Sequence, residues 1–152
     1  LLPIKLPIPG MKLGLANIMV VIGLYYLDVK DMFFVIMLKT VLTTLLLGTF
    51  SMFAYGFVGA ILSYICMLLA FRGLKKNISF IGISMIGGLM HNIGQIIVAM
   101  ILIKTKAIAY YMMFLLPMGL VTGVAIGLVA KLVMTRLNEF SLFSKYYKLT
   151  SE

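Results

Sequence analysis

Apolar residues dominate five stretches of the chain, at about residues 13–27, 32–49, 53–71, 79–103 and 109–135. None of them alternates apolar and polar residues with a period of two, which disfavours a β-barrel and favours helices. A helix needs about 17 residues or more to cross a bilayer, and only the first stretch is shorter than that. The sequence therefore predicts an all-α integral membrane protein, a polytopic bundle with five spans.

Composition agrees with this pattern, because 63% of the 152 residues are hydrophobic. Soluble domains contain about 45–50% apolar residues. The formal net charge of +9 does not indicate nucleic-acid binding, since the basic residues lie in short joints and near the C-terminus, as topology signals do. The lone Cys66 excludes a disulfide within the chain.

The basic residues also predict an orientation. They gather after the third stretch and near the C-terminus, and the positive-inside rule places both regions in the cytoplasm of a plasma-membrane protein. Residues 1–12 then lie outside, so we expect a further helix before Leu1 and six spans in all. Residues 1–137 form one transmembrane domain, followed by a tail at 138–152 that is partly ordered, or binds an anionic membrane surface or a partner. The basic residues of these two regions are Arg72, Lys75, Lys76, Lys131, Arg136, Lys145 and Lys148.

The middle of stretch 79–103 is unexpectedly polar. At 100° per residue, Ser84, Gly88, His91 and Gln95 fall within an arc of about 60°, and Asn92 flanks it. Unpaired polar groups at this depth cost several kcal/mol, so they face protein or a cavity and mark a candidate functional site. Two interpretations remain open: the side chains bind a polar ligand group, or they hydrogen-bond helices to one another.

Lys39 lies near the midpoint of its stretch, too far from either interface for its side chain to reach water. It is expected to point into the bundle with Thr43 on the same face. No span contains Asp or Glu, so its partner is either a ligand anion or backbone carbonyls, unless the lysine is neutral.

Glycines at four-residue intervals predict close helix packing. Gly119, Gly123 and Gly127 form a tandem GxxxG, and Gly56 and Ala60 repeat the spacing once. Such ridges serve packing inside a bundle or docking to a separate membrane subunit.

The prolines and glycines of residues 7–17 predict a folded loop or lid on the outer face, with Lys12 and Asn17 where it meets the membrane. One His and no carboxylate in the spans argue against an intrinsic metal or haem site. The chain contains no GxxxxGK[ST] motif, so any energy for transport must come from a partner. No catalytic residue is expected.

Several motifs together resemble one family. PGMKLGLAN (9–17), GLMHNIGQ (88–95) and GLVTGVAIGLVAKL (119–132), with a basic residue at position 39, are similar to the Gx transporter family, also labelled heptaprenyl diphosphate synthase component I. The resemblance covers about residues 3–136. It implies a relation to the six-helix S components of energy-coupling-factor transporters, whose pocket opens outward beneath the first external loop.

The resemblance implies a membrane binding or transport protein for a small amphipathic, anionic solute, working with an energising partner. In this reading Lys39 meets the anionic group, and His91, Asn92 and Gln95 meet the polar head. A membrane subunit of an extracellular electron-transfer system and an accessory to isoprenoid synthesis are the alternatives. A quinone, a flavin or an isoprenoid would then occupy the pocket. The chain lacks the aspartate-rich motifs of prenyl synthases, so no catalysis by the chain alone is expected.

Overall fold

The computed structural model describes residues 9–47, 50–74 and 78–139, and every regular element in those ranges is a helix. In chain order these are α1 (Pro9–Tyr26), α2 (Val29–Leu47), α3 (Phe50–Leu74), α4 (Phe80–Ile103), the 3₁₀-helix η2 (Lys106–Tyr111) and α5 (Met112–Glu139). The expected all-α bundle is therefore confirmed. Residues 140–152 of the predicted tail lie outside the described ranges.

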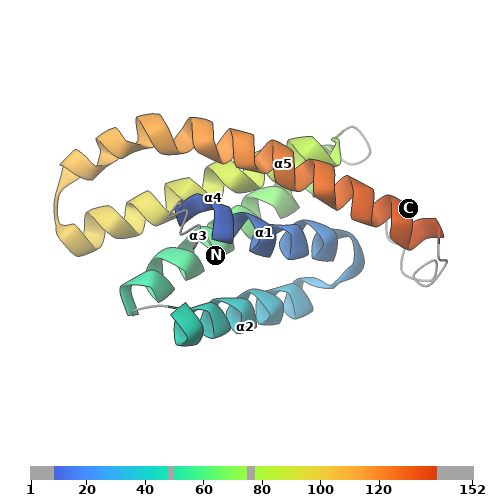
Figure 1. Cartoon of the computed structure of the whole chain (residues 1–152), viewed down its shortest axis with the longest axis horizontal. Helices are drawn as coiled ribbons and strands as arrows, with labels where there is room; N and C mark the ends of the chain where they lie inside the picture. Colours follow the sequence, from blue (N-terminus) through green and yellow to red (C-terminus); the bar gives the residue numbers. More distant parts are fainter. Residues whose placement is uncertain (1–8, 48–49, 75–77, 140–152) are drawn as a thin grey trace, which may run out of the picture.

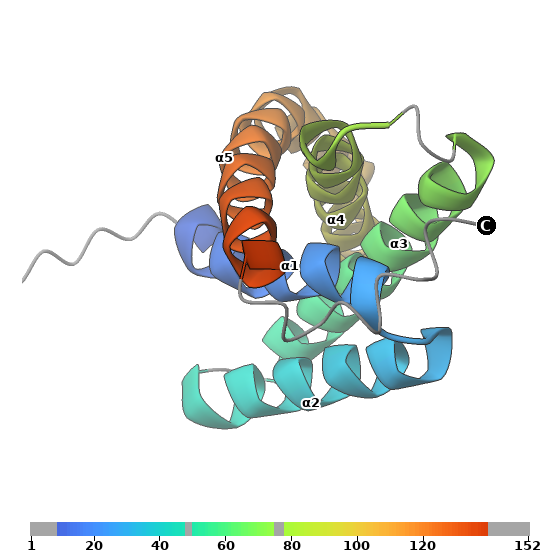
Figure 2. The same cartoon turned by 90° about the vertical axis from the view of Figure 1, so that its right-hand side faces the viewer.

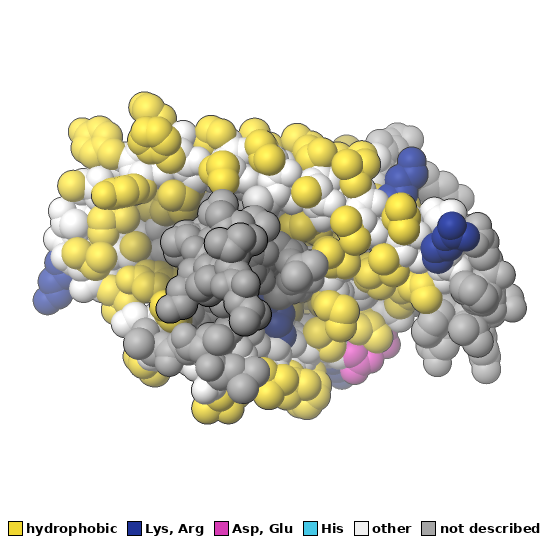
Figure 3. Space-filling model, in the orientation of Figure 1, with side chains coloured by type: hydrophobic (Ala, Val, Ile, Leu, Met, Phe, Trp, Pro, Cys, Tyr) yellow, Lys and Arg dark blue, Asp and Glu magenta, His cyan; other side chains and the backbone are white. Residues whose placement is uncertain are grey.

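Within the described ranges, three helical segments are long and apolar enough to cross a membrane: Phe50–Leu74, Phe80–Ile103 and Lys106–Leu137. Hydrophobic side chains cover much of the surface, and the visible Lys and Arg side chains lie mostly near the two ends of the long axis (Figure 3). The protein is therefore a membrane protein. Spanning by α1 and α2, and a sixth helix before Leu1, stay predictions.

Helix α4 occupies the centre of the molecule and packs between α3 and α5. Figures 1 and 2 show α1 between α5 and α2, with α2 at the edge of the bundle. Side chains from five helices meet in the core, which α1 and α3 supply most heavily. Its buried members are Val20, Val21, Leu24, Met32, Ile36, Ala60, Tyr64, Met67, Ile83, Ile126 and Ala130.

Local chemistry explains where α4 begins and ends. The Ser79 hydroxyl accepts a hydrogen bond of 3.0 Å from the backbone N–H of Gly82, which caps the exposed donors of the first turn. At the other end, Lys104 takes the left-handed conformation, with φ of 53°, that commonly terminates helices.

The expected loop at residues 7–17 is wrong from Pro9 onward, because α1 begins at Pro9. Proline is well suited to the first helical position, where its missing N–H would have no intrahelical partner. The residues that follow include Met, Lys, Leu and Ala, which favour helix over loop. Pro7 lies outside the described ranges.

Candidate functional site

His91 is the buried centre of the candidate site. It lies on α4, is 4% exposed and packs against Gly59 of α3. A Cβ atom added to Gly59 would lie 2.9 Å from the His91 carbonyl oxygen and 3.1 Å from its ring. The ring therefore occupies space that any larger residue at position 59 would fill.

The imidazole is only partly hydrogen-bonded. Its Nε2 lies 3.3 Å from Nε2 of Gln95, one turn further along α4. In this arrangement the amide donates to the ring, which leaves the proton of a neutral imidazole on Nδ1. Nδ1 faces the Gly59 backbone but does not complete a hydrogen bond. His91 thus retains an unsatisfied buried polar atom, which is costly unless something pairs with it.

Lys39 approaches this centre from α2. It is half-buried, and it lies close enough to His91 for its charge to act on the imidazole. No ion pair to Lys39 occurs within residues 9–47, 50–74 and 78–139. The nearest acid in sequence, Asp31, lies eight residues earlier on α2, about 12 Å along the helix axis. We call Lys39, His91 and Gln95 the polar cluster.

Other residues predicted for the site lie elsewhere. Thr43 is exposed, and its hydroxyl donates to the Lys39 carbonyl oxygen at 2.8 Å, so it adds no buried group to the polar cluster. Asn92 Nδ2 donates to the Leu115 carbonyl oxygen of α5 at 2.6 Å and acts as an interhelical tie. Ser84 is buried with an unpaired hydroxyl.

The two N-terminal candidates differ in what the structure describes. Asn17 is buried on α1, and its position along the helix axis is about 14 Å before Tyr26, the last residue of α1. Lys39 lies about 15 Å beyond Val29 on α2, which runs back alongside α1, so the two residues lie at similar heights (Figure 1). The backbone of Lys12 is helical, but its side chain is not described.

The predicted glycine ridges lie against other helices of the chain. Gly119, Gly123 and Gly127 face the backbone of α4, so this ridge is used inside the bundle. Gly56 lies beside Thr40 of α2, since its added Cβ would be 3.6 Å from Thr40 Cγ2, and Ala60 belongs to the core.

Sequence analysis missed two residues on α3 that shape the site. Gly59 makes room for His91, and Ser63 is fully buried with an unpaired hydroxyl. A signal was present, because Gly59 and Ser63 have the small-xxx-small spacing of closely packed helices.

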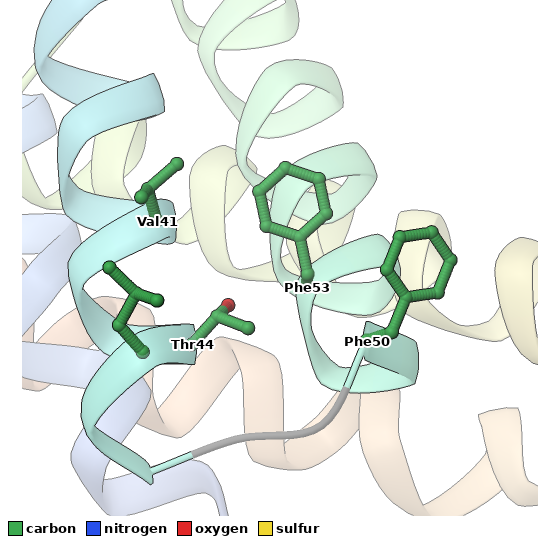
Figure 4. A pocket seen from close by; sticks show the side chains of 5 residues that line it. Val41, Thr44, Phe50 and Phe53 are labelled. Carbon is green, nitrogen blue, oxygen red and sulfur yellow. The ribbon is translucent and has the colours of Figure 1, made fainter.

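Neither of two apolar grooves on the surface is lined by the polar cluster. The larger, of about 300 Å³, lies between α2 and α3 and is lined by Val41, Thr44, Leu45, Phe50 and Phe53 (Figure 4). At 100° per residue, Val41 is about 160° around α2 from Lys39, so the groove is on the far side of the helix. The second is lined by Met19, Ile22, Gly23, Tyr26, Leu27, Val35 and Leu137.

Residues 1–133 match the sequence model of the heptaprenyl diphosphate synthase component I family. The chain belongs to this family. The match includes all three members of the polar cluster and the glycine ridge of α5. No curated protein and no solved structure matched the chain.

Proposed function

We propose that this member of the family is a membrane-embedded binding protein for a small amphipathic anion. The observation that carries the proposal is Lys39, at the middle of an apolar helix, within electrostatic range of buried His91 and without an acidic partner among the described residues. An ammonium in this setting is costly unless an anion or several hydrogen-bond acceptors compensate it. A ligand carboxylate or phosphate would supply that compensation.

The members of the polar cluster would bind different parts of the ligand. Lys39 would meet the anionic group, while His91 and Gln95 would bind neighbouring polar atoms of the head. The apolar surroundings would hold the remainder of the ligand. If the protein works as S components do, it would sit in the plasma membrane with its C-terminus in the cytoplasm and deliver the ligand to, or with, an energising partner.

The family name favours a second candidate, in which the chain is an accessory component in isoprenoid synthesis. A prenyl diphosphate is itself an amphipathic anion and would use the same lysine. The sequence has four acidic residues, of which Asp28 and Asp31 are the only two close together. A magnesium-dependent synthase needs more carboxylates, so in this reading a partner subunit would perform the catalysis.

Binding of octyl phosphate to the protein in lipid nanodiscs tests the proposal. Lys39→Met should weaken binding about ten- to a hundredfold, because a hydrogen bond to a charged group contributes about 1.5–3 kcal/mol. Lys30→Met removes an exposed lysine from the same helix and should leave affinity unchanged. Octanol should not compete. Equal affinity in the two variants would refute the role of Lys39.

A further inference from the structure

We propose that the C-terminal half of α2, from Lys39 to Leu47, is a gate that swings away from α3 to admit the ligand to the polar cluster. This inference rests on the proposed function. It is motivated by the closed geometry, since His91 is buried and neither apolar groove is lined by a residue of the cluster.

Helices α3, α4 and α5 form the fixed part of the molecule. An added Cβ on Gly94 would lie 2.8 Å from Gly59 Cα, and one on Gly123 would lie 2.7 Å from Met85 Cα. Such backbone-to-backbone contact leaves no room for sliding or tilting. The hydrogen bond from Asn92 to Leu115 further joins α4 to α5.

Helix α2 is held firmly only in its first half. Met32 and Ile36 are fully buried, and Met32 fills the space beside Gly23 of α1. Beyond Thr40 most of the described residues are exposed. The hydroxyls of Thr40, Thr43 and Thr44 all donate to carbonyls of α2 itself, at 2.7–2.8 Å, and so do not join it to α3.

The contact between α2 and α3 is less extensive than the contacts that α4 makes with α3 and α5. The added Cβ of Gly56 meets Thr40 Cγ2 at 3.6 Å, an ordinary van der Waals distance. Just beyond Thr40 on α2, the apolar groove separates Val41 and Thr44 from Phe50 and Phe53 (Figure 4). Among the described residues, parting the helices here breaks no side-chain hydrogen bond between them.

Opening at this contact would uncover the polar cluster. Gly56 lies three residues, about 4.5 Å along the axis, before Gly59, against which His91 packs. Moving Thr40 away from Gly56 would also carry Lys39 outward, because the two residues are adjacent. A ligand would then reach His91 through the opening, and Lys39, about 100° around α2 from Thr40, would lie at its edge.

A disulfide between Thr40→Cys and Gly56→Cys, in a Cys66→Ala background, would lock the gate. The added Cβ of Gly56 lies 3.6 Å from Thr40 Cγ2, so the two cysteines would be direct neighbours across the contact. Binding of radiolabelled octyl phosphate in nanodiscs should be at least about tenfold slower in the oxidised protein, because binding that requires a conformational change is slow. Reduction of the same sample is the matched control and should restore the rate. Equal rates in both states would overturn the gate while leaving the proposed function standing.

Spin labels give a readout that does not depend on the ligand. Labels at Leu42→Cys and Val121→Cys report the distance from the gate to α5. Labels at Leu69→Cys and Val121→Cys report the distance from α3 to α5. All three positions are exposed. The first pair should show a second, longer distance, and the second pair a single one. A single distance for both pairs would contradict the gate. If octyl phosphate binds neither wild type nor reduced protein, the proposed function fails, and the spin labels alone decide whether α2 moves.

Discussion

Lys39 illustrates how one residue can oppose stability and serve binding. Its charge lies in the middle of α2, and no carboxylate in the described ranges offsets it. A protein that needed α2 only for packing would be better served by an apolar side chain of similar size. The anionic ligand proposed above would offset this charge.

Replacing this lysine should separate the two roles. We expect Lys39→Met to raise the free energy of unfolding by about 1 kcal/mol or more, because it removes an unpaired charge from an apolar setting. Thermal unfolding in detergent, without added ligand, measures the change. A variant that loses both stability and binding would show instead that Lys39 has a structural partner.

Gly59 should be the most sensitive glycine of α3. Gly59→Ala should cost about 1–3 kcal/mol, because its Cβ would press on the His91 ring and carbonyl. Gly73 of the same helix has open space around it, so Gly73→Ala should gain up to about 1 kcal/mol from helix propensity. Comparing the melting temperatures of the two variants tests whether His91 packs closely against Gly59. Stabilisation of both variants would refute this close packing.

At the scale of elements, α4 is the helix on which the others are arranged. The sequence placed its small and polar residues within one arc, but the structure divides that arc between two neighbours. Gly88 and Asn92 face α5, whereas His91 and Gly94 face α3. Periodicity identifies the thin side of a helix, but it does not say which helices will cover it.

The first and last residues of a helix could be predicted from the sequence where local chemistry determines them. Stretch 79–103 matches α4 closely, since Ser79 caps its start and polar residues follow its end. Thr43 shows the opposite case: it shares the inward face of α2 in an ideal helix but is exposed. Its exposure depends on how far α1 and α3 extend beside α2, which is a tertiary property absent from the sequence pattern.

The contact between α4 and α5 should tolerate no added atom at Gly88. Gly88→Ala would drive a methyl group into the Gly119 carbonyl oxygen, so we expect a loss of about 1–3 kcal/mol. Gly82→Ala is the control, because its Cβ would meet the flexible Ile78 side chain. In detergent, the melting temperature of Gly88→Ala should be well below that of Gly82→Ala. The same melting temperature for both would contradict the packing described.

At the scale of the whole molecule, basic residues lie at helix ends that share one end of the bundle. Figure 1 places the end of α3, the start of α4 and the end of α5 toward one end of the molecule, and the turn from α4 into α5 at the other. Arg72 and Arg136 occupy the last turns of α3 and α5, at the first of these ends. The positive-inside rule predicts that this end faces the cytoplasm.

Labelling of single cysteines tests this orientation. In a Cys66→Ala background, a membrane-impermeant thiol reagent should label Lys104→Cys in intact cells and Arg72→Cys only after permeabilisation. The two positions bracket α4, so opposite accessibility also shows that α4 crosses the membrane. The reverse pattern would invert the topology.

The central claim is that the polar cluster holds an amphipathic anion. Mass spectrometry of small molecules released from the purified protein tests it most directly, with Lys39→Met and Lys30→Met prepared in parallel. We expect one anionic amphiphile near one molecule per chain in wild type and Lys30→Met, and little or none in folded Lys39→Met. Finding no such anion in wild type, or the same amount in all three proteins, would contradict the claim.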